Sequence, residues 1–180
     1  MLTVTIPETE EYDPKTECFY IRKQQVLSLE HSLVSLAKWE SKWKKPFLSD
    51  KEKTREESID YIRCMTITQN VDPEVYYRIP QNVMDKINEY IGDPMTATTF
   101  SDTRPAKRNN EVITAEIIYY WMVALQIPFE CQKWHLNRLI TLVRVCNIKN
   151  SPPEKMSKND IFRRNAALNA ARRKAGHTRG

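Results

Sequence analysis

The pattern of hydrophobic and polar positions predicts strands first and helices afterwards. Residues 2–6 alternate leucine, valine and isoleucine with threonine, which is typical of a half-buried strand, and Pro7 ends it. An acidic loop follows, and residues 18–21 form a second candidate strand. Five apolar residues between 26 and 43 fall on one side of a helix, namely Val26, Leu29, Leu33, Leu36 and Trp43. Although Glu40 interrupts this stripe and Trp39 lies off it, the spacing predicts an amphipathic helix that ends at Pro46.

Local start and stop signals divide the middle of the chain. A capping box at residues 54–57 predicts a helix to about residue 66, and the pair Asp72-Pro73 is a helix start signal. Residues 83–91 have helical apolar spacing, with Gly92 at the place of a left-handed C-terminal cap. The threonine-rich run 95–100 predicts a further strand.

The most apolar part of the chain lies between residues 113 and 146. Residues 113–126 are apolar nearly all round, which indicates a helix at the centre of the core. After a break at residues 127–129, residues 130–146 have one apolar helix face that includes Cys131 and His135. The two segments predict a central helical hairpin. The expected fold class is therefore mainly α, with a helical core, a few short strands and a C-terminal helical arm.

Domain organisation follows from a change of composition near residue 150. Residues 1–150 are expected to form one core domain, and Ser151-Pro152-Pro153 is a linker signal. Residues 151–180 contain eight lysines and arginines and two acidic residues, so this basic arm carries the positive charge of the protein. Because the arm has few large apolar residues, its helix is marginal in water, and we expect a flexible or helical arm.

Composition excludes several classes of function. The chain has only 3 glycines, so it has neither a P-loop nor a dinucleotide-binding fingerprint. The longest unbroken apolar run is too short to span a bilayer, and we expect no membrane association. The four cysteines form no C-x-x-C pair and no secretory signal is present, which together favour a reducing cytoplasm.

Neither catalysis nor metal binding is expected. Cys131 and His135 have the i, i+4 spacing of two metal ligands on a helix, but zinc needs two more at a recognisable spacing. A thiol on a buried face is inert, so a cysteine nucleophile is not expected either. We therefore expect no enzyme activity, no metal and no cofactor.

Two stretches resemble small proteins from the tail-gene region of long-tailed bacteriophages, namely residues 29–47 (LEHSLVSLAKWESKWKKPF) and residues 119–150 (YYWMVALQIPFECQKWHLNRLITLVRVCNIKN). The run MTATTF and the C-terminal run NAALNAARR add to this resemblance. The similar proteins are of the tail assembly chaperone type, which implies a non-enzymatic protein of the host cytoplasm. Such a protein coats the tape measure protein while tail-tube subunits polymerise around it. The chain has no slippage run near its end, so the frameshifted longer product common in that family is not expected.

We expect the basic arm to bind the tape measure protein or other tail proteins. The expected partner-binding residues are Ile161, Phe162, Arg163, Arg164, Leu168, Arg172 and Arg173. Three alternatives remain open. In the first, the arm is a solvated tail that keeps the protein soluble, and its seven-residue apolar spacing is incidental. In a virion structural protein, a tail or connector subunit, the acidic residues 8–17 would pair with the basic arm of a neighbouring copy. In a packaging or regulatory factor, the arm would bind DNA with a steep salt dependence.

Overall fold

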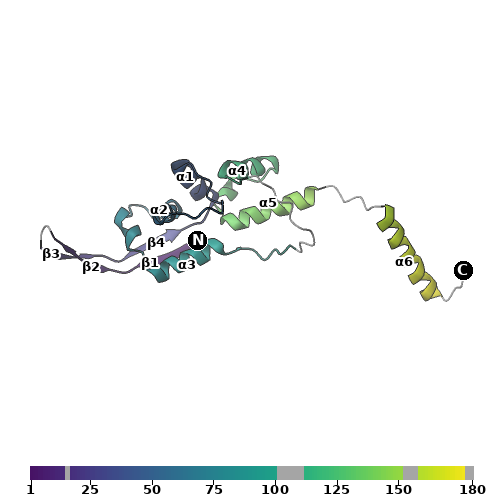
Figure 1. Ribbon diagram of the computed structural model, residues 1–180, viewed down its shortest axis with the longest axis horizontal. Coiled ribbons are helices and arrows are strands. Elements are labelled where there is room, and N and C mark those ends of the chain that lie inside the picture. Colours follow the sequence, from purple (N-terminus) through teal and green to yellow (C-terminus); the bar gives the residue numbers. More distant parts are fainter. Residues whose placement is uncertain (15–16, 101–111, 152–157, 177–180) are drawn as a thin grey trace. The chain divides into compact units, whose positions relative to one another are not determined.

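The computed structural model describes residues 1–14, 17–100, 112–151 and 158–176, and it divides into two compact units, Met1–Asn147 and Ile148–Gly180. Helices form most of the regular structure of the first unit, together with two two-stranded sheets (Figure 1). The prediction of a mainly helical fold with a few short strands is confirmed. The two prolines of the predicted linker lie outside the described residues.

The four strands form one long hairpin. Strand β1 (Leu2–Ile6) pairs antiparallel with β4 (Gln25–Leu29), and β2 (Thr9–Asp13) pairs with β3 (Cys18–Arg22). Leu2 lies opposite Leu29 and Asp13 lies opposite Cys18, so the register continues unbroken from one sheet into the other. We call β1 and β4 the inner hairpin, and β2 and β3 the outer hairpin. The strands predicted at residues 2–6 and 18–21 are confirmed, whereas the expected acidic loop contains β2.

Helix α1 begins later than the sequence pattern predicts. It spans Leu33–Trp43, because residues 25–29 pair with β1 as a strand instead. Leu27 and Leu29 are fully buried while Val26 is exposed, which is the period of a strand. The Ser32 side chain forms a capping box with Ser35 that fixes the start of the helix.

The capping box at Thr54 is confirmed in detail. Helix α2 spans Arg55–Met65, the Glu57 carboxylate accepts a hydrogen bond from Thr54 N at 2.8 Å, and Glu57 N donates to Thr54 Oγ1 at 3.2 Å. Lys45 also donates to this carboxylate, and these bonds lower the pKa of Glu57. The buried glutamate therefore stays ionised at the N-terminus of α2, where the helix dipole favours negative charge.

Two short elements follow α2. The start signal at Asp72 is confirmed, but it begins the 3₁₀-helix η1 (Pro73–Arg78) rather than an α-helix. The Asp72 side chain accepts a hydrogen bond from Glu74 N at 3.0 Å. Helix α3 then spans Gln81–Gly92, as the apolar spacing predicts.

The region after α3 contradicts two predictions. Gly92 lies inside the last turn of α3 without a positive φ, and Asp93 ends the helix in an extended conformation. No strand forms within residues 95–100 of the described chain. Met95 has a φ of 50°, and its N–H donates to the Asp93 side chain at 2.7 Å, so a local turn replaces the predicted strand.

The segment 113–126 forms α4 (Ala115–Ala124), and its position differs from the prediction of a central helix. Ala115, Ile118 and Met122 are fully buried, but Tyr120 and Val123 on the opposite side are exposed. The helix therefore lies at the edge of the core with one apolar side uncovered.

The segment 130–146 is not one helix. It divides into the 3₁₀-helix η2 (Phe129–Lys133) and α5 (Leu136–Asn150). The break occurs because His135 pairs with Ser32 as a β-bridge, and Leu136 N donates to His31 O at 2.7 Å. A tertiary contact with the end of the inner hairpin thus overrides the local helical pattern.

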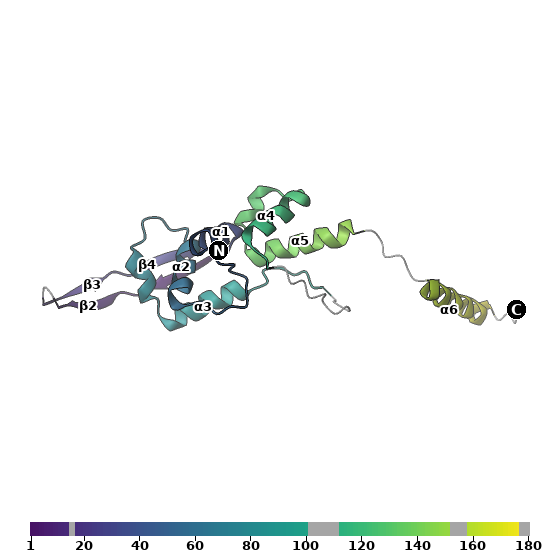
Figure 2. The same cartoon turned by 45° about the horizontal axis from the view of Figure 1, so that its top comes forward.

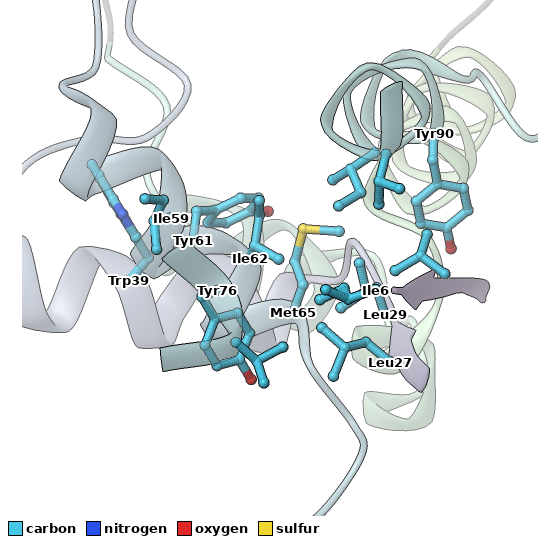
Figure 3. Packing of buried hydrophobic residues seen from close by; sticks show 14 residues of the cluster. Ile6, Leu27, Leu29, Trp39, Ile59, Tyr61, Ile62, Met65, Tyr76 and Tyr90 are labelled. Carbon is cyan, nitrogen blue, oxygen red and sulfur yellow. The ribbon is translucent and has the colours of Figure 1, made fainter. Parts of the chain in front are cut away.

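Two hydrophobic clusters form the core of the first unit. The first joins the inner hairpin to α2, η1 and α3, and Figure 3 shows Met65 lying beside the strand residues Leu27 and Leu29. The second joins α1 to α4, η2 and α5 through Leu33 and Leu36. Helix α1 contributes to both clusters, which makes it the element that connects them. No helix in the described ranges is long and apolar enough to cross a membrane.

Candidate partner-binding surfaces

The predicted partner-binding residues all lie on helix α6 (Lys158–Gly176), in the second unit. Every residue from 161 to 176 is exposed, including the large apolar side chains Ile161, Phe162 and Leu168, and Phe162 has 75% of its surface accessible. Exposed apolar side chains on a helix with several arginines are characteristic of a surface that binds a partner.

The helix brings only some of the predicted residues together. Ile161 and Leu168 are seven residues apart and share one side of α6, with Arg164 and Arg172 beside them at helical spacing. Phe162, by contrast, lies about 100° away around the helix axis. Arg163 and Arg173 also point away from the side that carries Ile161 and Leu168. The helix therefore has one narrow apolar stripe, Ile161 and Leu168, flanked by two arginines.

The outer hairpin carries a second surface, which the sequence analysis did not identify. Tyr12 and Phe19 are opposite each other across β2 and β3, with ring centroids 5.1 Å apart, and both are exposed. The neighbouring pair on the same face is Glu10 and Ile21, also exposed. We call Glu10, Tyr12, Phe19 and Ile21 the outer face. The signal in the sequence that could have revealed it was the aromatic and apolar run of residues 19–21, with Tyr12 in the acidic segment before it.

The outer face lies beyond the inner hairpin, whose Val4 and Ile6 are buried in the first core cluster. Side chains alternate along a strand, so Glu10 and Tyr12 share one side of β2. In both ribbon views β2 and β3 extend beyond the helices that cover β1 and β4 (Figure 1, Figure 2). The outer face therefore has no cover within the described residues of the first unit.

The opposite face of the outer hairpin is tied to η1. Arg22 forms ion pairs with Glu11 and with Asp72 and Glu74, which lie at the start of η1. Arg78 at the end of η1 donates to Thr9 Oγ1 at 3.0 Å. These contacts hold the base of the outer hairpin against the body of the first unit.

Tyr20 lies on this same opposite face of the outer hairpin, beside Glu11 and Arg22. Its hydroxyl donates to a Glu11 carboxylate oxygen at 2.5 Å, and this bond, together with Arg22, lowers the pKa of Glu11. Glu11 is therefore ionised and already bonded, whereas Glu10 on the outer face points away from this cluster.

Helix α4 provides a third exposed apolar surface. Tyr120 and Val123 lie one turn apart on its outer side, and Phe129 follows at the start of η2; all three have more than half of their surface accessible. The buried Glu40 orients this helix, because its Oε2 atom accepts a hydrogen bond from Ala115 N at 2.7 Å. The sequence pattern identified α4 as apolar on all sides, but only the structure separates its buried side from its exposed side.

Cys131 and His135, the candidate metal ligands, are both buried, as expected for core positions. They do not share a helix, because Cys131 lies in η2 and His135 lies in the bridge before α5. Within the described ranges, no group of three or more histidines, cysteines and acidic residues is arranged to hold a metal ion.

His135 instead packs against His31 at the junction of the two core clusters. The His31 and His135 ring centroids are 5.0 Å apart, and His31 Nδ1 lies 2.6 Å from the hydroxyl of Tyr61. His135 Nε2 donates to Tyr90 O at 2.9 Å. Burial lowers the pKa of His31 to about 4, and the nearby His135 adds to the effect, so His31 is neutral at neutral pH.

Comparison of the chain with protein-family models, with curated proteins and with solved structures found no match. The function is therefore argued from the exposed surfaces and from the sequence resemblance described above.

Proposed function

We propose that the protein is a non-enzymatic assembly factor for bacteriophage tails, similar to the tail assembly chaperones, and that it binds the tape measure protein or tail-tube subunits in the host cytoplasm. The observation that carries the proposal is α6, a separate basic helix with exposed apolar residues. The resemblance of residues 29–47 and 119–150 to tail-gene proteins supplies the biological setting.

In this proposal α6 binds a helical segment of the partner. Ile161 and Leu168 enter an apolar groove, while the aliphatic parts of Arg164 and Arg172 cover its edges. An isolated helix with so few apolar residues is marginal in water, so α6 gains stability when the partner covers its stripe. The partner thus stabilises the helical form of α6, and the cost of ordering this helix makes the association readily reversible.

The exposed side of α4 has a supporting role in the proposal. Tyr120, Val123 and Phe129 offer apolar surface to segments of the tape measure protein that would otherwise aggregate.

The proposal is tested by co-expression of the tape measure protein with the full chain or with a chain that lacks residues 151–180. We expect the full chain to co-purify with the tape measure protein and to keep it soluble, and the truncated chain to remain folded but to lose binding. Retained binding by the truncated chain would remove the basic arm from the mechanism.

A point variant gives a sharper test of the apolar stripe. Leu168→Asp introduces a charge into the stripe and should weaken binding by at least about tenfold, the effect of losing one central apolar anchor. Ala167→Asp adds the same charge on another side of α6 and serves as the matched control. Equal binding by both variants would contradict the role of the stripe.

Analysis of purified particles separates the proposal from the structural alternative. A chaperone is expected to be absent from finished tails, and detection of this chain in tails by mass spectrometry would favour a virion subunit instead. Measurement of DNA binding at several salt concentrations tests the interpretation as a DNA-binding factor. In that case the logarithm of the binding constant falls linearly with the logarithm of the salt concentration, with a slope of about −0.9 per phosphate contacted.

A further inference from the structure

We propose that the outer face of the hairpin binds helix α6 of a second copy of the chain, so that copies associate head to tail. This interaction does not rest on the tape measure proposal, because both of its surfaces belong to the protein itself. It uses the same apolar stripe of α6, so one α6 binds either a second copy or the tape measure protein at a time.

The first argument is the apolar area that each surface leaves exposed. Tyr12, Phe19 and Ile21 form an apolar face on the outer hairpin, and Phe19 has 72% of its surface accessible. On α6, the two apolar side chains of the stripe, Ile161 and Leu168, are exposed as well, with 44% and 46% of their surfaces accessible. An amphipathic helix packs well across a two-stranded sheet that has one apolar face, since each then covers the other.

The second argument is charge. Residues 8–17 contain five acidic residues and one lysine, whereas residues 158–176 contain six basic residues and one acidic residue. Glu10 lies on the outer face itself, beside Ile21. On α6, Arg164 and Arg172 flank the apolar stripe. Seating α6 on the outer face thus places arginines beside carboxylates while the apolar side chains are covered.

Charge also favours α6 of a second copy over a second outer face as the surface that covers the outer face. Two outer faces that stacked on each other would bring two acidic segments together, which like-charge repulsion opposes. The helix α6 has the opposite charge and a matching apolar stripe, so it is the better occupant. Each copy offers one outer face and one α6, and this heterologous arrangement allows a chain of copies or a closed ring.

The outer hairpin is positioned to receive such a helix. Arg22 and Arg78 fasten its other face to η1, so the outer face is held in place before a partner arrives. A surface that is ordered in advance loses less conformational entropy on binding.

The test uses the full chain without any other protein. Sedimentation velocity over a range of concentrations up to about 100 μM detects association with a Kd near 10 μM. We expect the protein to associate, and the association to weaken as the salt concentration rises, because salt screens the charges. A monomer at all concentrations, including one whose own α6 occupies its outer face, would overturn the proposal.

Two charge-reversal variants identify the surfaces. Glu10→Lys changes the outer face and leaves α6 intact, and Arg172→Glu changes α6 and leaves the outer face intact. Each change lies at an exposed position and should weaken self-association by about tenfold or more. Glu89→Lys, at an exposed position on α3, is the matched control and should associate like the unaltered chain. Association that persists unchanged in both interface variants would overturn the proposal.

Mixing the variants gives the decisive measurement. A Glu10→Lys chain still has a functional α6, and an Arg172→Glu chain still has a functional outer face. An equimolar mixture should therefore associate more strongly than either variant does alone. Failure of the mixture to associate, when the unaltered chain does, would show that these two surfaces do not meet. None of these outcomes depends on co-purification with the tape measure protein, so the two proposals can fail separately.

Discussion

The Glu40 carboxylate joins α1 to the first residue of α4, because its Oε2 atom accepts a hydrogen bond from Ala115 N at 2.7 Å. Its Oε1 atom accepts from Phe47 N at 2.8 Å, and the side chain is buried. One carboxylate thus satisfies two backbone N–H groups that no helix or strand pairs, and it places negative charge at the N-terminus of α4.

We predict that Glu40→Ala destabilises the protein by about 3 kcal/mol, because it leaves two N–H donors without their acceptor. Glu40→Gln keeps one acceptor oxygen and should lose about half as much. Urea unfolding of the two variants and of the unaltered protein measures both losses of stability. Glu89→Ala, at an exposed position on α3, is the control and should change stability by less than about 0.5 kcal/mol. An unchanged midpoint for Glu40→Ala would show that this carboxylate does not hold α4 in place.

The buried His31 predicts acid sensitivity. Its pKa is about 4 in the folded protein and about 6.5 when unfolded, so the unfolded state binds more protons between these values. The neutral His31 should therefore cost no stability above pH 6.5. As the pH drops from 6.5 towards 4, the free energy of unfolding should fall by up to about 3 kcal/mol because of this group.

The comparison with His31→Gln isolates this effect, since the acidic groups that also titrate at low pH are common to both proteins. The variant loses packing against His135 and the contact with Tyr61, so it should be less stable at pH 7. The difference in stability between the two proteins should shrink as the pH falls from 6.5 to 4. A difference that stays constant over this range would contradict the role of His31.

The capping box of α2 predicts a local loss of stability. Thr54→Ala removes the acceptor for Glu57 N and should destabilise the protein by about 1 kcal/mol. Thr99→Ala, at an exposed position outside helices and strands, provides the control. Thermal unfolding followed by circular dichroism distinguishes them, and equal melting temperatures would indicate that the cap makes no net contribution.

Replacement of Arg22 should change the local motion of the outer hairpin rather than the overall stability of the protein. Its ion pairs lie on the surface, where such pairs contribute little to the free energy of unfolding, so Arg22→Ala should lower it by less than about 1 kcal/mol. The variant nevertheless releases the outer hairpin from η1. Hydrogen exchange of the amides in β2 and β3 should become faster, while exchange in α2 stays the same. Lys23→Ala, at the exposed neighbouring position, is the control and should leave hydrogen exchange unchanged both in the outer hairpin and in α2.

Local signals in the sequence predicted the elements that depend on neighbouring residues alone. The alternation of residues 2–6 predicted β1, and the Thr54 capping box predicted the start of α2, since each is a pattern within a few residues. The apolar spacing after Pro80 predicted α3 for the same reason. The basic composition of α6 and its few large apolar residues could likewise be read from the sequence, whereas their role in binding stays a prediction.

Contacts between distant residues decided the rest. The apolar spacing assigned residues 26–29 to a helix, and that prediction was wrong because pairing with β1 made them a strand. The bridge between Ser32 and His135 divided a segment whose local pattern was helical throughout. Whether an apolar residue is covered depends on what packs against it, which explains why only the tertiary structure distinguished the buried side of α4 from its exposed side. The outer face arises in the same way, because the hairpin continues past the helices that cover its inner half.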